Sequence, residues 1–301
     1  MRLCDDKKIL KNLVEEINTD TGILKTYIEK DYYAISILKE LVSRNDKFVF
    51  KGGTSLSVCQ KAIQRFSEDI DISYEDEIIT VGTRKRIKQA FIDSIEATSL
   101  SISNLENIRS RRIFNRYLCP YESLWDPQGD QVIVEWATQT PSFPIEEKTA
   151  QTIIGKYLDS IDRHDLVKKY GLEEFKVKTI TKERTLVDKV FAICDYHISK
   201  KLTRQSRHIY DLYHLLKYVD LNDELIKLFN NVKEYRVKLE TCYSAHMDKS
   251  ISTLLKELIN EETYKKDYNN ITFPLLYDHI KYDEAITAIQ TIQQFLDKSG
   301  L

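Results

Sequence analysis

The spacing of apolar residues predicts alternating helices and strands in the first part of the chain. Apolar residues recur at near-helical intervals between residues 28 and 45, whereas Gln131–Ala137 has the alternation and β-branched content of a strand. We expect a helix at 28–45, a strand at 47–50, a helix at 54–63, a strand at 69–72, a helix at 83–97, weak strands within 98–119, a strand at 131–137, a helix near 150–170 and a strand at 175–180.

The remainder of the chain has a helical pattern up to its C-terminus. We expect helices at 183–198 and 204–218, followed by further helices. Only eight glycines and five prolines occur in 301 residues, which favours long helices and few loops. The pattern therefore predicts an α+β domain over residues 1–175 and a mostly helical domain over residues 176–301.

A glycine turn leads from the first strand into a short helix. Gly52 and Gly53 follow the apolar Val49-Phe50 pair and permit a tight turn, and the helix begins near Thr54. The first amides of a helix have no partner within it, so they attract phosphate. A P-loop is excluded because no lysine follows these glycines in the required position.

Two aspartates follow on the next strand. Asp69 and Asp71 alternate with Ile70 and Ile72, so the carboxylates share one face and the isoleucines enter the core. Two carboxylates about 5 Å apart repel by roughly 3 kcal/mol at an effective dielectric near 20, which favours a bound cation. Mg²⁺ suits this pair, with Mn²⁺ as an alternative, since it takes one or two protein carboxylates together with phosphate oxygens. Either fragment alone also fits an ordinary turn or a solvated strand face, but together they indicate nucleotidyl transfer.

These segments resemble the AbiEii/AbiGii toxin family, which includes the MenT toxins, within the polymerase β-like nucleotidyltransferase superfamily. The resemblance rests first on Lys51–Leu56 with Arg65–Asp71. Residues 178–181, 185–190 and 207–213 resemble the later motifs in the expected order. The resemblance covers about residues 45 to 220 and implies a nucleotidyltransferase-fold mixed sheet with flanking helices.

The resemblance also implies roles for residues outside the acidic pair. Lys189 matches a lysine that contacts the nucleotide phosphates, and Asp211 matches a later catalytic or nucleotide-positioning aspartate, so the helical domain would contribute to the site. Lys178 and Arg207 match supporting phosphate or base contacts. The residues expected to bind the nucleotide are Gly52, Gly53, Thr54, Ser55, Lys178 and Arg207.

Glu135 is a candidate third carboxylate. It shares a strand face with Ile133 and Ala137, where a charge interrupts an apolar surface. In the superfamily, a strand beside the acidic pair commonly supplies such a group, frequently as Asp. Glu135 is therefore a candidate metal ligand or general base, and a charge at a strand edge is the alternative.

Composition limits the classes of protein to consider. The hydrophobic content of 42% suffices for a sizeable core, and neither a membrane-length apolar run nor a signal-peptide pattern occurs, so we expect a cytoplasmic protein. The five cysteines are widely spaced without a Cys-x-x-Cys pair, which predicts buried thiols rather than disulfides or zinc.

Basic residues cluster despite a net charge of −2. Residues 176–207 hold nine basic and three acidic residues, a net charge of +6, and Arg109, Arg111, Arg112 and Arg116 form a second group. Such clusters suit a polyanion that approaches one face, although a solvated surface is the simpler alternative.

Together these features predict a metal-dependent toxin that transfers a nucleotide from an NTP to RNA. The resemblance implies the tRNA 3′ end as acceptor, a block of translation and a cognate antitoxin. Transfer to a protein or small molecule, or nucleotide or RNA binding without catalysis, remain the alternatives.

The resemblance also marks Ser67 as a phosphorylation candidate. A phosphate two residues before Asp69 would add about −1.5 to −2 charge beside the acidic pair and repel an incoming triphosphate. We expect Ser67→Asp to abolish activity, and full activity in that variant would exclude this mechanism. A hydroxyl that only hydrogen-bonds near the strand start is the alternative.

Overall fold

A computed structural model describes residues 1–67 and 69–301 of the chain. These residues divide into two compact units. The first unit comprises Met1–Cys59 and Ser67–Thr179, and the second comprises Gln60–Phe66 and Ile180–Leu301. The expected boundary at 175/176 thus lies four residues later, because the last strand pairs with the first and belongs to the sheet.

Within the described residues of the first unit, six strands form one mixed sheet in the order β3-β4-β2-β1-β6-β5. The strands are β1 (Phe48–Lys51), β2 (Asp69–Tyr74), β3 (Phe114–Tyr121), β4 (Asp130–Ala137), β5 (Ile145–Ala150) and β6 (Phe175–Ile180). β1 pairs antiparallel with β2 and parallel with β6, while β4 pairs parallel with β2 and antiparallel with β3. The expected α+β class is confirmed.

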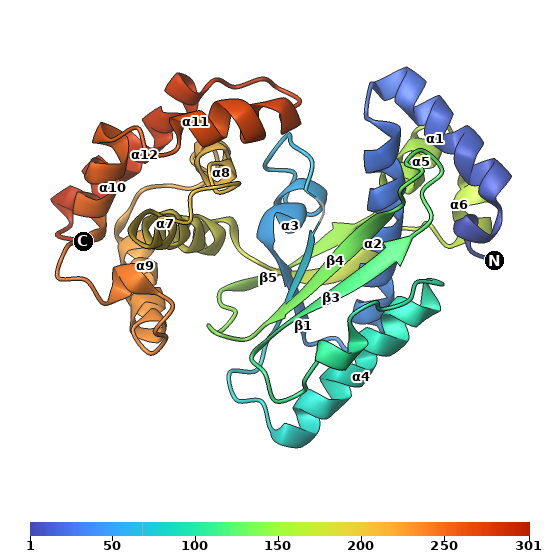
Figure 1. Cartoon of the computed structure of the whole chain (residues 1–301), viewed down its shortest axis with the longest axis horizontal. Helices are drawn as coiled ribbons and strands as arrows, with labels where there is room; N and C mark the ends of the chain where they lie inside the picture. Colours follow the sequence, from blue (N-terminus) through green and yellow to red (C-terminus); the bar gives the residue numbers. More distant parts are fainter. Residues whose placement is uncertain (68) are drawn as a thin grey trace. The chain divides into compact units, whose positions relative to one another are not determined.

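Six α-helices accompany the sheet in the described part of this unit. They are α1 (Lys7–Thr21), α2 (Lys25–Arg44), α3 (Gly52–Val58), α4 (Val81–Ala97), α5 (Ile153–Ser160) and α6 (His164–Tyr170). Helices α2 and α4 contact each other and lie alongside the sheet (Figure 1). Aromatic rings join α4 to the sheet: Phe91 stacks on Tyr117 with centroids 5.0 Å apart and meets Trp136 edge-on at 5.7 Å.

Burial alternates along the strands that carry the acidic residues. Ile70 and Ile72 are fully buried, as are Val132 and Val134, whereas the residues between them are only partly buried. One face of β2, β3 and β4 thus packs on the apolar core. The other face carries polar side chains, as the alternation predicts.

Several elements differ from their expected ranges. α3 ends at Val58 rather than Ile63 because the chain leaves the first unit at Gln60. The expected helix over 150–170 is two helices, α5 and α6, interrupted near Asp162, whose φ is +57°. The weak strands within 98–119 form the single strand β3, and β5 was not predicted.

In its described residues, the second unit has α-helices and no sheet strand, as predicted. They are α7 (Lys182–Ser199), α8 (Arg207–Leu215), α9 (Asp223–Arg236), α10 (Ile251–Asn260), the short α11 (Lys265–Asp267) and α12 (Tyr282–Lys298). α7 packs on α8, α9 and α10, and α12 packs on α8 and α10. Buried leucines and rings such as Phe191 and Phe229, 5.9 Å apart, fill the interior.

Two further observations concern the described chain. None of its helices combines the length and apolarity needed to cross a bilayer. Four of the five cysteines are buried, as predicted, Cys4 is partly buried, and all five are free thiols.

Candidate active site

The glycine turn and the acidic strand meet in the first unit. Lys51 lies opposite Asp71 in the β1–β2 register, and the next residue, Gly52, begins α3 with a φ of +76°. A Cβ on Gly52 would lie only 1.8 Å from Oδ2 of Asp71. Glycine is therefore required here both for its backbone conformation and because the Asp71 carboxylate occupies the space of a side chain.

A row of four charged residues crosses the sheet at this point. Asp71 lies opposite Glu135 on β4, and Glu135 lies opposite Arg116 on β3, so the row is Lys51, Asp71, Glu135, Arg116. Residues opposite each other in a sheet point to the same face. The two carboxylates in the middle of the row are therefore flanked on each side by a cation.

Glu135 is bound by its neighbour in this row. Its Oε1 lies 2.7 Å from Nε and 2.5 Å from Nη2 of Arg116. Since Arg116 holds this carboxylate, Glu135 is supported as part of the charged row. Whether it is a metal ligand or a general base stays a prediction.

The acidic pair fits a magnesium ion. Within the described residues, no group of three or more His, Cys, Asp or Glu side chains could hold a metal ion. Asp69 and Asp71 supply two carboxylates from alternate positions of one strand, and Asp71 is seated against the backbone at Gly52. Mg²⁺ requires no more than this, because water and phosphate oxygens complete its shell.

The hydroxyl of Thr54 forms a hydrogen bond that connects α3 to the start of β2. Its hydroxyl donates to the carbonyl oxygen of Asp69 at 2.6 Å, and its oxygen lies 3.1 Å from the hydroxyl oxygen of Ser67. Thr54 and Ser55 are both buried. The Thr54 hydroxyl therefore positions Asp69, and phosphate binding by Thr54 and Ser55 stays a prediction. Glu68, part of the sequence motif, lies outside the described residues.

In the second unit, Asp211 lies at the centre of a buried ion cluster. Arg65 donates from Nε to Oδ1 at 2.7 Å and from Nη2 to Oδ2 at 2.8 Å, and Lys189 donates to Oδ2 at 2.7 Å. Asp211 is 0% exposed, Arg65 3% and Lys189 7%. The geometry brings two of the predicted residues together and adds Arg65, to which we assigned no role from the sequence.

The charges in this cluster do not balance, because two cations share one carboxylate. Burial alone would raise the pKa of Asp211, but Arg65 and Lys189 outweigh it and lower that pKa. Burial lowers the pKa of Lys189 despite the attraction of Asp211, and the nearby Arg65 lowers it further. The pKa of His208 falls well below its usual value through burial and then the repulsion of Lys189 and Arg207. The cluster is thus suited to an anion.

Arg65 could not have been identified from sequence spacing. It lies 146 residues from Asp211, and no local periodicity connects them. Its segment also supplies the amide of Gln64, which donates to the Tyr210 hydroxyl at 3.2 Å. The only sequence signal was its place in the string that ends at Asp71.

The two supporting candidates lie in different units. Lys178 is on β6, and its ammonium group is 2.7 Å from Oε2 of Glu75. Arg207 is the first residue of α8, the helix that carries Asp211. Their roles in nucleotide binding stay predictions.

Three solved structures are similar to the chain in fold. The chain superposes on a Helicobacter pylori protein classed as a nucleotidyltransferase with a TM-score of 0.51 and 14% identity, over 92% of this chain and 97% of that one. Two other structures have TM-scores of 0.48. One is JHP933 from Helicobacter pylori, with 13% identity over 92% of this chain and 94% of that one. The other is the nucleotidyltransferase toxin MenT4 of Mycobacterium tuberculosis, with 15% identity over 89% and 85%. No curated protein sequence matches the chain.

The first of these superpositions shows that the chain has a nucleotidyltransferase fold. The model of the nucleotidyl transferase AbiEii toxin family, of type IV toxin–antitoxin systems, matches residues 36–297. The chain therefore belongs to the AbiEii nucleotidyltransferase toxin family, and the resemblance drawn from its motifs is confirmed.

Proposed function

We propose that this protein is a Mg²⁺-dependent nucleotidyltransferase that moves a nucleotide from an NTP to RNA, at the 3′ end of tRNA. The observation that carries the proposal is the position of the Asp71 carboxylate. It lies directly against Gly52, on the same strand face as Asp69. A pair of carboxylates beside a phosphate-binding turn is the arrangement that nucleotidyl transfer requires.

Each residue of the first unit then has a defined task. Asp69 and Asp71 hold Mg²⁺ (or Mn²⁺), which when bound supplies positive charge for the acceptor oxygen and the departing pyrophosphate. The backbone amides of Gly53, Thr54 and Ser55 bind the triphosphate. Thr54 also fixes the main chain at Asp69 through its hydroxyl.

Residues of the second unit would act on the triphosphate. Lys189 contributes a positive charge from a cluster that holds one more cation than it has carboxylates. Asp211 orients Lys189 and balances part of its charge. Lys178 and Arg207 are supporting contacts to phosphate or base.

Family membership supports the biological side of the proposal. A toxin of a type IV system has a cognate antitoxin as its partner, and modification of tRNA ends would block aminoacylation and translation. Ser67 lies against Thr54, so a phosphate on Ser67 would stand beside the first turn of α3 and repel a triphosphate.

A label-transfer assay tests the proposal. The purified protein is incubated with Mg²⁺, each labelled NTP in turn and total tRNA. We expect label in tRNA, its loss in Asp71→Asn, and its retention in Asp46→Asn, a matched change at an exposed aspartate. Absence of label with every NTP, or equal labelling by both variants, would contradict the proposal.

The position of the label separates the alternatives. Label that is removed by ribonuclease supports RNA as acceptor, whereas label that is removed only by protease indicates a protein acceptor. Calorimetry that shows Mg²⁺-independent NTP binding without turnover would instead indicate a non-catalytic binding protein.

A further inference from the structure

Two segments of the first unit concentrate basic residues. They are residues 81–88, the first half of α4, and residues 105–116, which end in β3; together we call them the basic face. They hold eight basic residues and one acidic residue, a net charge of +7. The basic residues are Arg84, Lys85, Arg86, Lys88, Arg109, Arg111, Arg112 and Arg116.

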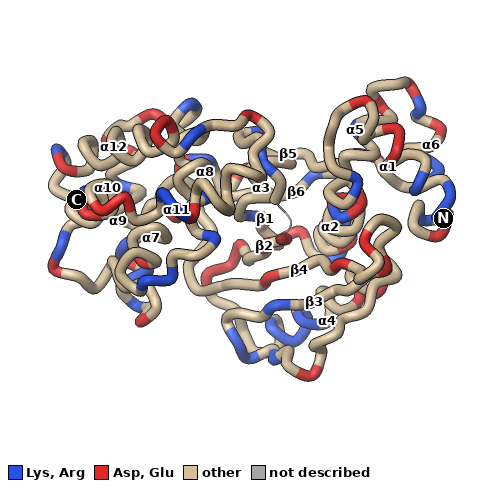
Figure 2. The backbone as a smooth tube through the Cα atoms, turned by 45° about the horizontal axis from the view of Figure 1, so that its top comes forward, with Lys and Arg blue, Asp and Glu red and all other residues tan. Residues whose placement is uncertain are grey.

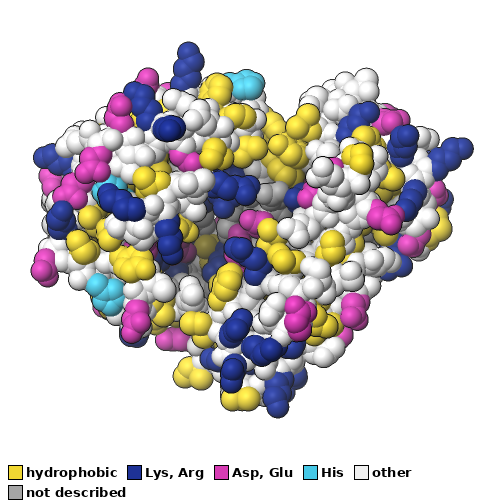
Figure 3. Space-filling view, viewed as in Figure 1, with side chains coloured by type: hydrophobic (Ala, Val, Ile, Leu, Met, Phe, Trp, Pro, Cys, Tyr) yellow, Lys and Arg dark blue, Asp and Glu magenta, His cyan; other side chains and the backbone are white. Residues whose placement is uncertain are grey.

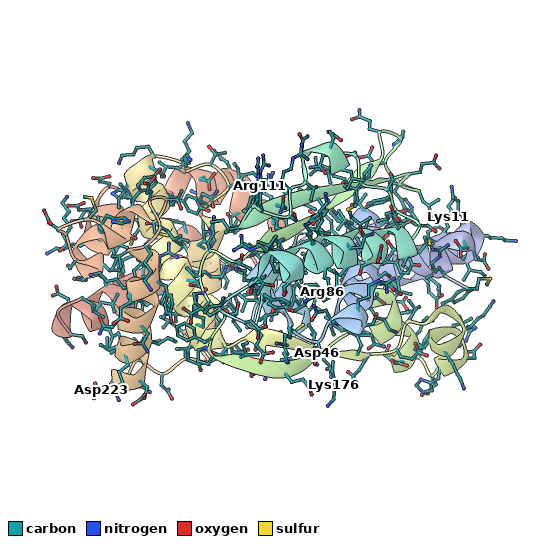
Figure 4. All side chains as sticks on the ribbon, turned by 90° about the horizontal axis from the view of Figure 1, so that it is seen from below. Lys11, Asp46, Arg86, Arg111, Lys176 and Asp223 are labelled. Carbon is teal, nitrogen blue, oxygen red and sulfur yellow. The ribbon has the colours of Figure 1, made fainter. Side chains whose placement is uncertain are left out.

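The two segments are bonded to each other. Nη1 of Arg84 donates to the carbonyl oxygen of Arg111 at 3.1 Å, and Nζ of Lys88 donates to that of Ile108 at 3.1 Å. Figure 2 shows Lys and Arg residues gathered where α4 begins and beside β3, and Figure 4 labels Arg86 and Arg111 on the two segments. Residues 20 and more apart in sequence therefore form one surface.

The positive charge of this face is largely uncompensated. Arg109 and Arg112 donate to backbone carbonyl oxygens, which bear no net charge. In the described part of the chain, Arg116 is the only one of the eight that pairs with a carboxylate. Of the three acidic residues just before α4, Glu75 pairs with Lys178 and Asp76 with Lys47, so the exposed Glu77 is the one that adds negative charge beside the face.

Apolar side chains lie exposed within and beside the same face. Ile78 is 85% exposed and Val81 73%, while Ile113 and Phe114 of the second segment are 41% and 38% exposed. Figure 3 shows hydrophobic side chains among the dark-blue ones in this region. A polyanion with flat apolar bases matches such a surface better than simple counterions do, because bases stack on aromatic rings.

α4 packs on the buried face of the sheet and Arg116 lies on the opposite face of the edge strand β3, so the basic face reaches the side of the acidic pair around this edge. Phe114 and Arg116 occupy alternate positions of β3, and both are exposed. Arg116 lies opposite Glu135, which lies opposite Asp71. An RNA strand that crosses the sheet from β3 over β4 to β2 would thus reach the candidate catalytic carboxylates within two β-strand spacings, about 10 Å.

We propose that the basic face binds the acceptor RNA and directs its single-stranded end along the row from Arg116 to Asp71. This inference rests on the proposed function. The arginines and lysines of α4 and of residues 109–112 bind phosphates, and Phe114 stacks on a base near the end of the strand.

RNA binding without NTP tests the inference apart from catalysis. Fluorescence anisotropy measures the affinity of the intact protein for labelled tRNA at low and moderate salt. The test variant is Lys85→Glu/Arg111→Glu, one change in each segment. In the described residues neither side chain has a hydrogen-bond or ion-pair partner, so the fold should tolerate both changes.

Lys8→Glu/Lys11→Glu is the matched control. Both lysines are exposed on α1, and Lys11 is labelled far from Arg111 in Figure 4. We expect the test variant to weaken binding at least tenfold and to reduce the slope of log affinity against log salt by about 1.4, since each of its two lost phosphate contacts to a single strand contributes about 0.7. The control should stay within about twofold of wild type. Phe114→Ala should weaken binding about tenfold with an unchanged slope.

The outcomes separate this inference from the proposed function. If wild type transfers label to RNA but the test variant and the control bind RNA with equal affinity, RNA binding by the basic face is refuted and the proposed function is unaffected. No label transfer to any RNA, with no RNA binding by wild type, overturns both. An acidic protein that binds this face while RNA fails to compete would replace RNA as its partner.

Discussion

At the scale of single residues, Gly52 determines both the backbone conformation of the turn and the space available to the Asp71 carboxylate. We predict that Gly52→Ala abolishes nucleotide transfer. A left-handed alanine costs about 1–2 kcal/mol, and its Cβ would displace the Asp71 carboxylate, which lies 1.8 Å from that position. The label-transfer assay and urea denaturation measure the two effects.

Gly22→Ala is the control for backbone strain. Gly22 has a φ of +74°, but nothing lies within 4 Å of its Cβ position. This variant should lose about as much stability from strain while keeping full activity. If Gly22→Ala were inactive as well, strain alone would explain the loss and the contact with Asp71 would be irrelevant.

Asp31 gives a pH dependence at a site remote from the chemistry. Burial raises the pKa of Asp31 from 3.8 to about 6, although its carboxylate accepts from the amide of Ile153 at 2.6 Å. The raised pKa means that the folded state binds the proton more tightly. The resulting stability is fully present below about pH 4 and is lost as the pH rises through 6.

We predict that Asp31→Asn removes the loss of stability that wild type shows as the pH rises through 6. Near pH 4 the variant should be no more stable than wild type. At pH 7.5 it should be more stable than wild type by up to about 3 kcal/mol, which corresponds to the rise of about two units in the pKa of Asp31. Urea denaturation at both pH values measures the change. A stability difference that is the same at both would refute the assignment.

The sequence allowed the acidic pair to be predicted residue by residue, because alternation along β2 is a local property. Ile70 and Ile72 are buried, and Asp69 and Asp71, which alternate with them, lie on the polar face, as expected. The contact of Asp71 with Gly52 is a property of the β1–β2 register. Spacing suggested it, but only the paired strands fix it.

At the scale of elements, the ion cluster links α7, α8 and the segment 60–66. We predict that Asp211→Asn costs about 3–5 kcal/mol, because Arg65 and Lys189 would remain buried without their carboxylate. Lys189→Met should cost little, since Arg65 and Asp211 then form a neutral bidentate pair and the protein already lowers the pKa of Lys189. Urea denaturation measures both variants.

The variants Lys189→Met and Asp211→Asn together distinguish a structural role of Lys189 from a catalytic one. If Lys189 binds phosphate, Lys189→Met will fold and yet transfer no label. A Lys189→Met protein as unstable as Asp211→Asn would show that the lysine holds the helices together. Full transfer by a folded Lys189→Met would remove it from the nucleotide site.

Element boundaries were predictable only where they depend on local pattern. β6 and the helices after residue 180 follow their apolar spacing. α3 ends early because residues 60–66 pack in the second unit, where Arg65 binds Asp211 and Gln60 donates to the carbonyl oxygen of Ile180 at 3.1 Å. No apolar spacing within 54–63 encodes a partner more than 100 residues away.

At the scale of the whole molecule, net charge conceals charge distribution. The chain carries −2 overall, yet two segments of the first unit carry +7. The sequence indicated only one of them, the arginines at 109–116, because α4 joins them through hydrogen bonds that connect separate segments. By contrast, part of the expected +6 of residues 176–207 is neutralised by carboxylates from outside the segment, those of Glu147, Glu75 and Asp211.

The composition of the second unit leads to a test on fragments. A fragment of residues 180–301 lacks Gln60–Phe66, which supplies Arg65 and the buried Ala62 and Ile63. Without Arg65, Asp211 keeps Lys189 as its partner and loses the bidentate bond. We therefore predict that the isolated fragment is less stable than the same unit in the intact chain, because it loses both the bidentate bond and the burial of Ala62 and Ile63.

A synthetic peptide of residues 58–67 should restore this stability when added to the fragment. The same peptide with Arg65→Met should not, because it cannot bind Asp211. Amide hydrogen exchange in α8 measures protection in the intact chain, in the fragment and with each peptide. Equal protection by the two peptides would show that Ala62 and Ile63 account for the effect. Protection of the bare fragment equal to that of the intact chain would show that the second unit folds independently of residues 60–66.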